Sequence, residues 1–292
     1  MLIRKKCLKI QERLGMRIGV AYGTHRTPVV QTAEQTLTAL ELFYKTGFRA
    51  FLLPRELFAK VTNISGLYKE HYNNLLKIKN IANKYNIELA VHNNSLPDDP
   101  KLDEELRIYC NIANVMDLRA LVIHPDFFRR MPQDQARRLV VYKINEIINE
   151  LRISAKIGIE TTGSVKEMGS VEDVLDIVKR TKNTEPVFNW AHIHGRSSGV
   201  MTSETDFRRI LETTRAQVGQ QWLADAYFIF SGASYSPSGV TKHQSVLNSD
   251  MKLEHLIKCV QSLNIKGTLI FETPGREKDI IDILERLGDM VR

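Results

Sequence analysis

The chain lacks the features that mark several broad classes of protein. Its 292 residues contain no apolar run that approaches the roughly 18 residues of a membrane-spanning helix. Only three cysteines occur, Cys7, Cys110 and Cys259, which is too few for a disulfide framework and favours a reducing, cytoplasmic setting. With 16 glycines, 9 prolines, 43% hydrophobic and 26% charged residues, the composition excludes collagen-like and disordered chains and fits a globular protein.

The N-terminal segment lacks the features of a secretion signal. Residues 1–15 carry a basic cluster, but they have neither the apolar core of such a signal nor its small-residue cleavage site. We expect this segment to be a basic N-terminal extension, either an amphipathic helix or a disordered arm. No stretch rich in proline, glycine or serine divides the remainder, so residues 16–292 are predicted to form a single domain.

Positive charge exceeds negative charge in the chain. Lys and Arg number 41 and Asp and Glu 34, which gives a net charge of +7 and an isoelectric point near 9.2. A basic surface suits a polyanionic partner such as DNA, because each neutralised phosphate releases condensed counterions. The alternative is a protein that is basic without such a partner.

Short apolar segments alternate with segments of helical periodicity. The apolar segments are continuous rather than alternating, which is typical of parallel strands buried on both faces. They span residues 17–21, 49–53, 88–91, 120–123, 156–159, 186–188, 227–230 and 268–271. The helical segments span residues 32–44, 67–85, 102–116, 133–151, 171–178, 203–211, 253–263 and 279–287.

This alternation predicts a closed (β/α)₈ TIM barrel. A doubly wound open sheet is the alternative, but the turn after the first predicted strand, YGTHRTP, lacks the G-x-G-x-x-G pattern common in that fold. The polar segment 231–250 is predicted to be a long loop, and long loops in compact domains are usually functional.

Side chains that can bind metals follow directly after several predicted strands. These residues are His92, His124, Glu160, Asn189, His192, His194 and Glu272, and the long loop after the seventh strand carries His243. In a barrel the carboxyl ends of all strands meet at one mouth, so we expect these side chains to converge there. Imidazoles and carboxylates are preferred ligands of Zn²⁺. The alternative for any one of them is a hydrogen-bonded histidine or a glutamate paired with an arginine.

Several of these positions also carry a resemblance to a known family. The segments VIHPD, GIETTGS, NWAHIHGRSSG, FSGASYSPSGVTKH and FETPG resemble, in this order, the endonuclease IV family of apurinic/apyrimidinic endonucleases, and more closely its archaeal-like branch. The resemblance spans roughly residues 17–290. It implies a TIM barrel with a zinc cluster that binds abasic or damaged DNA. It also implies hydrolysis of the phosphodiester 5′ to the lesion, as in base excision repair.

The resemblance implies three groups of metal ligands, with Glu160 and Glu272 as catalytic glutamates. The groups are His92, His124 and Glu160; Glu160, Glu272, Asn189 and Ile229; and His192, Thr241 and His243. Where the family has Asp, His and Asp, this chain has Asn189, Ile229 and Thr241. Isoleucine cannot bind a metal, and an amide or a hydroxyl binds one only weakly. The expected cofactor is therefore one to three zinc ions, with Mn²⁺ or Mg²⁺ as alternatives.

Loop residues near the predicted mouth could contact DNA. The candidates are Phe127, Phe128, Arg129, Arg130, Arg196 and Lys242. Aromatic side chains can stack on bases or wedge into a duplex, and basic side chains can hold phosphates. The alternative is that the phenylalanines pack under their loop and the basic side chains are merely solvated.

Two other functions compete with a nuclease. One is a xylose-isomerase-like sugar isomerase or epimerase, since such barrels also bind divalent metals through strand-end Glu and His. The other is a catalytically degenerate DNA-binding homologue, which Ile229 favours because it removes a ligand. The sequence does not indicate an oligomeric state.

Overall fold

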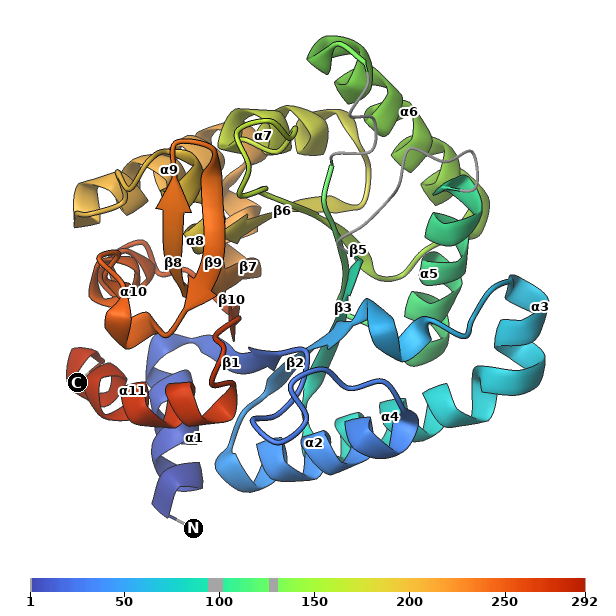
Figure 1. The fold of residues 1–292 in the computed structure, drawn as a ribbon, viewed down its shortest axis with the longest axis horizontal. Coiled ribbons are helices and arrows are strands. Elements are labelled where there is room, and N and C mark those ends of the chain that lie inside the picture. Colours follow the sequence, from blue (N-terminus) through green and yellow to red (C-terminus); the bar gives the residue numbers. More distant parts are fainter. Residues whose placement is uncertain (1, 94–101, 126–130, 292) are drawn as a thin grey trace.

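Eight parallel strands close into a barrel that helices surround (Figure 1). The computed structural model describes residues 2–93, 102–125 and 131–291. The barrel strands are β1 (Met16–Ala21), β2 (Ala50–Pro54), β3 (Glu88–Asn93), β4 (Ala120–Ile123), β5 (Lys156–Glu160), β6 (Thr184–Asn189), β7 (Ala226–Phe230) and β10 (Gly267–Phe271). Each pairs in parallel with its neighbours, in the order β1-β10-β7-β6-β5-β4-β3-β2. The predicted single-domain TIM barrel is confirmed.

The helices follow the strands as the periodicity predicts. In the described residues they are α1 (Leu2–Leu14), α2 (Ala33–Thr46), α3 (Ile64–Gly66), α4 (Tyr72–Tyr85), α5 (Leu102–Met116), α6 (Gln133–Leu151), α7 (Val171–Arg180), α8 (Trp190–Arg196), α9 (Glu204–Val218), α10 (Leu253–Ser262) and α11 (Glu277–Met290). Side chains cap their first turns: Thr32 accepts a hydrogen bond from the backbone of Gln35, and Ser170 forms a capping box with Asp173. None of these helices is both long and apolar enough to cross a membrane.

The apolar side chains form an inner and an outer cluster. The inner cluster fills the barrel and includes Ala21, Ala90, Val122, Ile229 and Ile270. The outer and larger cluster lies between the strands and the surrounding helices. Because each strand buries both faces, its sequence is continuously apolar, and this is why the strands could be located from the sequence.

Residues 2–14 belong to the same core as the barrel. They form α1, which packs against α2 and α11 and buries Cys7, Ile10 and Leu14. Gln11 joins the helix to the barrel: its Oε1 accepts a hydrogen bond from the backbone nitrogen of Ile18 at 2.8 Å. The segment that the sequence set apart as an extension is therefore the amphipathic helix, and it contributes to the hydrophobic core.

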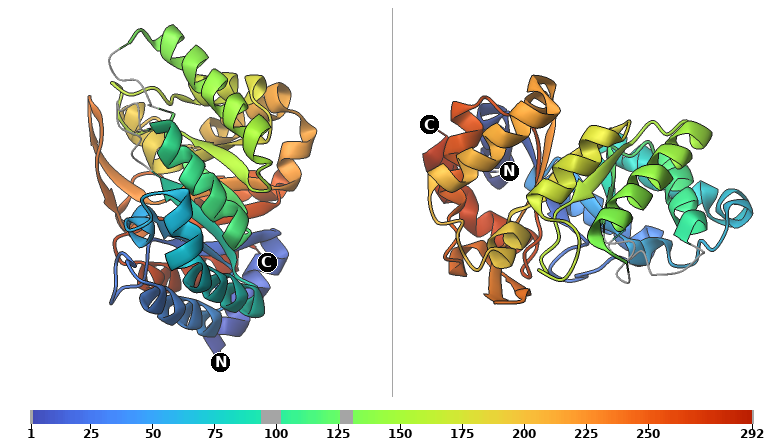
Figure 2. Two further views of the ribbon diagram at one scale, coloured as in Figure 1. Left: turned by 90° about the vertical axis from the view of Figure 1, so that its right-hand side faces the viewer. Right: turned by 90° about the horizontal axis from the view of Figure 1, so that it is seen from above.

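The predicted loop 231–250 contains an antiparallel hairpin, so that prediction is wrong for part of the segment. Its strands are β8 (Gly232–Ser236) and β9 (Gly239–Gln244). The hairpin rises at the end of the barrel where the strands finish, beside α8 (Figure 2). It lies at the mouth of the barrel rather than in the core, so β9 is only partly buried and its sequence is mostly polar. Because the two strands form no apolar run, the sequence pattern does not predict them.

Candidate metal centre

Three predicted ligands come together at the ends of β3, β4 and β5. His92 is the last residue but one of β3, Glu160 ends β5, and His124 follows β4 directly. Neighbouring parallel strands finish at the same level, so these side chains reach one point. Nε2 of His92 lies 2.6 Å from Oε2 of Glu160, and Nε2 of His124 lies 3.6 Å from the same oxygen. One ligand atom from each of the three residues lies within 4.8 Å of the others.

The three side chains suit a divalent cation. Nε2 of His124 is buried and has no hydrogen-bond partner among the described residues, although it faces the fully buried Glu160. A buried polar atom without a partner is costly, and a bound ion would satisfy it. Two imidazole nitrogens and a carboxylate oxygen are the donors of many catalytic zinc sites. The residues present therefore fit the cofactor that the sequence predicts.

Electrostatics keeps Glu160 ionised and favours a proton on the neighbouring His92. Burial alone would raise the pKa of Glu160, but His92 and His124 outweigh it and hold that pKa well below its usual range. Burial would lower the pKa of His92, but the neighbouring charge of Glu160 outweighs it and raises that pKa. In the metal-free protein a proton therefore lies between Nε2 of His92 and Glu160, and a cation could replace it.

A closed ring of hydrogen bonds joins this triad to Glu272 at the end of β10. Nδ2 of Asn189 donates to Oε1 of Glu160 at 3.0 Å and to Oε2 of Glu272 at 2.9 Å. The hydroxyl of Tyr22 donates to Oε1 of Glu272 at 2.7 Å and lies 2.7 Å from Nδ1 of His92. The bond from His92 to Glu160 completes the ring. Glu272 is 8% exposed, so these partners largely determine its surroundings.

Tyr22 was not among the site residues predicted from the sequence. It is the first residue after β1, in the turn YGTHRTP, and it has a backbone φ of 68°. A non-glycine residue in the left-handed region is uncommon and often marks a functional site. The available signal was its place at the end of a barrel strand, which it shares with His124, Glu160 and Glu272.

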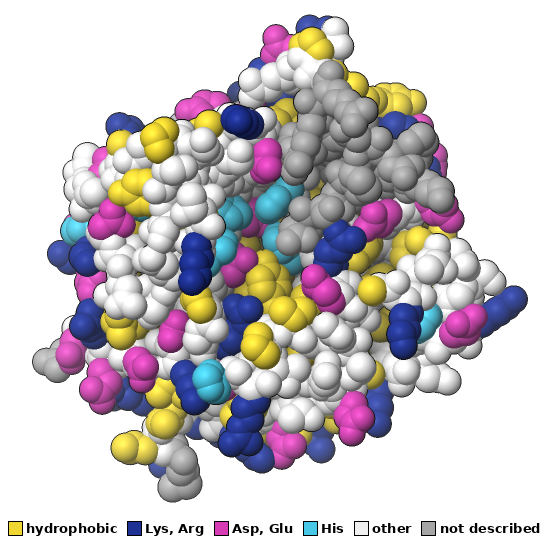
Figure 3. All heavy atoms as spheres, in the orientation of Figure 1, with side chains coloured by type: hydrophobic (Ala, Val, Ile, Leu, Met, Phe, Trp, Pro, Cys, Tyr) yellow, Lys and Arg dark blue, Asp and Glu magenta, His cyan; other side chains and the backbone are white. Residues whose placement is uncertain are grey.

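His192 and His243 extend the cluster along the mouth. The ring centroids of His124 and His192 lie 5.8 Å apart, and those of His192 and His243 5.4 Å apart. Nδ1 of His192 donates to the carbonyl of Thr161 at 2.7 Å, and burial lowers the pKa of His192 to about 4, so this ring is neutral. Nε2 of His243 lies 3.9 Å from Oε2 of Glu272. Histidine side chains gather near the centre of this face (Figure 3).

Three positions differ from the ligands that the resemblance to endonuclease IV implies, and none of them supplies a strong metal ligand. Ile229 is completely buried in the barrel interior. Thr241 is exposed on β9. Asn189 turns its nitrogen to the two carboxylates, and its oxygen accepts a hydrogen bond from the backbone of His192 at 3.3 Å. Because carboxylates can only accept, this orientation of the amide satisfies all its neighbours.

Residues 40–290 match the Xylose isomerase-like TIM barrel family. The chain belongs to this family. It is also similar to the uncharacterized protein MJ0133 of Methanocaldococcus jannaschii, with 23% identity over 290 residues that cover 95% of this chain and 100% of that protein. The match confirms that the chain belongs to the wider family of xylose-isomerase-like barrels. Its resemblance to endonuclease IV in particular stays a prediction.

Solved structures of similar fold carry several activities. D-psicose 3-epimerase from Clostridium cellulolyticum H10, solved with D-tagatose, has a TM-score of 0.65 at 13% identity and covers 95% of this chain and 98% of its own. SacUVDE has a TM-score of 0.67 at 14% identity, covering 94% and 99%. The IOLI protein, solved with a binding zinc atom, has a TM-score of 0.63 at 13% identity, covering 94% and 95%. At these identities the likeness shows the fold alone.

The structure describes two of the six predicted DNA contacts of this xylose-isomerase-like barrel, and these two lie on different elements. Lys242 is exposed on β9. The guanidinium of Arg196 donates to Oγ1 of Thr162 at 3.2 Å and to the carbonyl of Ser164, so it joins α8 to the loop after β5. The remaining four, Phe127, Phe128, Arg129 and Arg130, lie outside the described residues.

His194, the remaining strand-end histidine, belongs to a different group of side chains. It is fully buried, and its Nε2 donates to Oδ1 of Asp250 at 2.9 Å. Tyr235 of the hairpin donates to the other oxygen of Asp250 at 2.7 Å. His194 therefore helps to hold β8 near α8 and does not join the metal cluster.

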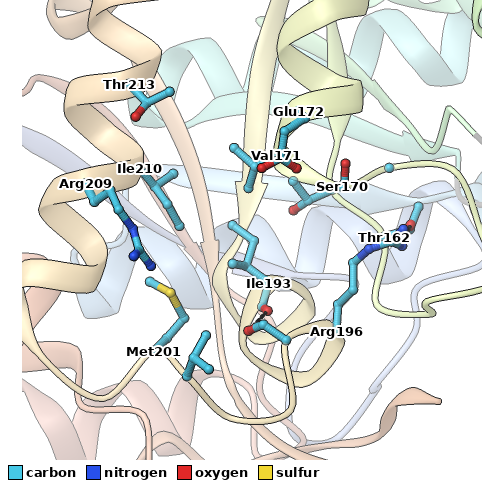
Figure 4. A pocket seen from close by; sticks show the side chains of 14 residues that line it. Thr162, Ser170, Val171, Glu172, Ile193, Arg196, Met201, Arg209, Ile210 and Thr213 are labelled. Atoms are coloured by element: carbon cyan, nitrogen blue, oxygen red, sulfur yellow. Dashed lines mark hydrogen bonds between the residues drawn. The ribbon is translucent and has the colours of Figure 1, made fainter. Parts of the chain in front are cut away.

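A pocket of about 420 Å³ lies beside the metal centre, between α7, α8 and α9 (Figure 4). Thr161 and Thr162, which follow Glu160, line one part of it, and Arg209 and Met201 line another. Its described lining contains no histidine. The chemistry of this mouth is therefore centred on the cluster itself, and the pocket is a separate cavity in the helical layer.

Proposed function

We propose that the chain is a divalent-metal-dependent phosphodiesterase that acts on abasic or otherwise damaged DNA and hydrolyses the phosphodiester 5′ to the lesion. The observation that carries the proposal is the convergence of His92, His124 and Glu160 within 4.8 Å at the barrel mouth, with Glu272 hydrogen-bonded into the same network. The net charge of +7 suits a polyanionic substrate.

His92, His124 and Glu160 are the residues that would hold the cation. A divalent cation there would stabilise negative charge on a phosphoryl oxygen of the substrate. Glu272 lies next to this position, and its oxygens are fixed by Tyr22 and Asn189. We assign it the role of general base toward the attacking water. Nε2 of His243, 3.9 Å from Glu272, lies on the open side of the mouth and would face the substrate.

Lesion selectivity follows from the position of the cluster. His92, Glu160 and Asn189 are at most 3% exposed, so an intact, stacked duplex could not bring a phosphate against them without local distortion. An abasic nucleotide can leave the helix at lower cost, because it has no base to unstack or unpair.

A sugar isomerase or epimerase is the second candidate. Glu160 and Glu272 face one another across Asn189, and two opposed carboxylates could move protons on opposite sides of a sugar. The likeness to D-psicose 3-epimerase agrees with this arrangement. However, the ends of β6 and β7 carry the Asn189 amide and the buried side chain of Ile229, neither of which is a strong metal ligand. A metal site between the two carboxylates is weaker for that reason.

An incision assay separates these candidates. The substrate is a duplex with one tetrahydrofuran abasic analogue, incubated with the protein and Zn²⁺, Mn²⁺ or Mg²⁺, with EDTA as the metal-free control. We expect cleavage 5′ to the analogue that EDTA abolishes. Glu272→Gln should lower the rate by about 10²–10⁴-fold, as expected for loss of a general base.

Glu285→Gln is the matched control, because Glu285 is 84% exposed on α11 and should leave the rate unchanged. Absence of incision with every metal would eliminate the nuclease. Interconversion of ketohexose epimers, followed by NMR, would then support the second candidate.

A further inference from the structure

We infer that the side-chain amide of Asn189 stands in place of a second metal ion between Glu160 and Glu272, so that this centre holds a single divalent cation. The inference rests on the proposed metal-dependent function and concerns the number of ions behind it. The resemblance to endonuclease IV implies a second ion bound by Glu160, Glu272 and the side chains at positions 189 and 229.

The amide nitrogen occupies the space between the two carboxylates. Nδ2 of Asn189 lies 3.0 Å from Oε1 of Glu160 and 2.9 Å from Oε2 of Glu272. Two buried carboxylates this close need a positive or hydrogen-donating group between them, because their charges repel. An amide NH₂ has two hydrogens and can give one to each. A cation bound to the same two oxygens would have to displace this nitrogen.

The neighbouring strand supplies no replacement ligand. Ile229 pairs with Asn189 across β6 and β7, is completely buried, and packs in the barrel interior with Ile270. Its hydrocarbon side chain stands where the resemblance implies an imidazole. An ion between the carboxylates would therefore have the two glutamates and no strong third ligand, whereas zinc sites in proteins use three or four.

The same amide supports the remaining metal site. Glu160 directs Oε2 toward His92 and His124, while its Oε1 accepts from Asn189. Oε2 of Glu160 is thus free to bind the first cation, and the hydrogen bond to Oε1 fixes the orientation of the carboxylate. Tyr22 holds the far oxygen of Glu272 in the same way. Neutral donors replace a cation on this side, so Glu272 stays outside the coordination of the metal and is available to act on the substrate.

Metal stoichiometry tests the inference without an activity assay. The parent chain, Asn189→Asp and Asn189→Asp/Ile229→His are dialysed against Zn²⁺, and the bound metal is measured by mass spectrometry. All three proteins, the parent included, also carry His243→Ala, so that an ion held by His192 and His243 is not counted. We expect one zinc per chain in the parent and two in the double variant, where a carboxylate and an imidazole restore the missing ligands.

Asn93→Asp is the matched control. Asn93 is also a fully buried amide at a strand end, but it faces Glu105 on α5 rather than the cluster. This variant should bind one zinc. If the double variant does not fold, the isosteric Asn189→Asp decides alone: a second retained zinc supports the inference and a single zinc overturns it.

The outcomes separate this inference from the proposed function. Two or three zinc ions in the parent would overturn the inference and leave the metal-dependent function standing. One zinc in a folded double variant would also overturn it. No zinc in the parent would instead remove the basis of the proposed function.

Discussion

The hydroxyl oxygen of Tyr22 lies 2.7 Å from Nδ1 of His92, so an aromatic residue at the end of β1 fixes a ligand at the end of β3. Burial, followed by the charge of Glu272, raises the pKa of Tyr22 well above its usual value. The hydroxyl therefore stays protonated and donates a hydrogen bond to Glu272. Nδ1 of His92 must then carry the hydrogen in its bond to Tyr22. This tautomer leaves Nε2 for the metal.

Tyr22→Phe is expected to weaken metal binding. The variant keeps the ring, which stacks on His92 and lies beneath the guanidinium of Arg276, but it loses both hydrogen bonds. Loss of such a partner of a metal ligand typically costs about 10–100-fold in affinity. Competition with a fluorescent zinc chelator measures the change.

Tyr142→Phe is the control for Tyr22→Phe. Tyr142 is 59% exposed on α6, and its hydroxyl contacts only Glu146 among the described residues. Zinc affinity in this variant should equal that of the parent. Equal affinity in Tyr22→Phe as well would mean that the hydroxyl does not orient His92.

His124→Ala is expected to abolish stable metal binding. It removes one of three ligands, and the two that remain, His92 and Glu160, already form a hydrogen bond at 2.6 Å that needs no ion. The bound metal is measured after gel filtration. His25→Ala is the control, because His25 is exposed in the loop after β1. Unchanged metal content in His124→Ala would show that the cation lies elsewhere.

The barrel and its first metal group could be predicted from sequence because both depend on strand ends. Strands buried on two faces leave continuous apolar runs, and the residue that ends each run lies at the mouth. His92, His124 and Glu160 follow this rule, so their convergence needed only the topology. The strand register then brings their ligand atoms within 4.8 Å.

The parts that were missed depend on contacts the sequence does not encode locally. The role of Tyr22 depends on a backbone turn with φ of 68° and on partners 70 and 250 residues away. The direction of the Asn189 amide depends on two glutamates from β5 and β10. The hairpin of β8 and β9 lies above the core, so no buried face imposes an apolar pattern on it.

Acid is expected to destabilise the metal-free protein through His192. Burial lowers the pKa of this residue in the folded chain to about 4, whereas an unfolded histidine titrates near ~6.5. Its contribution to the free energy of unfolding is therefore fully present above about pH 6.5 and is lost as the pH falls through about 4. The loss is on the order of 3 kcal/mol.

Urea unfolding in EDTA at several pH values measures this loss. His192→Gln does not titrate, so its stability should decline less steeply than that of the parent over this range of pH. His25→Gln, at an exposed site, should follow the parent. Identical slopes for His192→Gln and the parent would show that His192 is not the group responsible.

Asp250→Asn is expected to loosen the hairpin that carries His243. Asp250 accepts hydrogen bonds from His194 at 2.9 Å and from Tyr235 at 2.7 Å. Burial opposes ionisation of this carboxyl, but these two bonds outweigh it and hold the pKa of Asp250 below its usual value. An amide is uncharged and has one oxygen: that oxygen can still accept from one partner, but the charge-assisted bond at the other position is lost and at best replaced by a weaker neutral one.

The expected consequence is faster hydrogen exchange at the amides of β8 and β9, by about tenfold, which corresponds to about 1.4 kcal/mol for one lost hydrogen bond to a charged group. Asp176→Asn is the control, because Asp176 pairs only with Arg180 on the surface of α7 among the described residues. If protection of the hairpin does not change, its position depends on its packing against α8 and not on Asp250. If protection falls and zinc binding by His92, His124 and Glu160 is retained, the hairpin positions His243 independently of the metal centre.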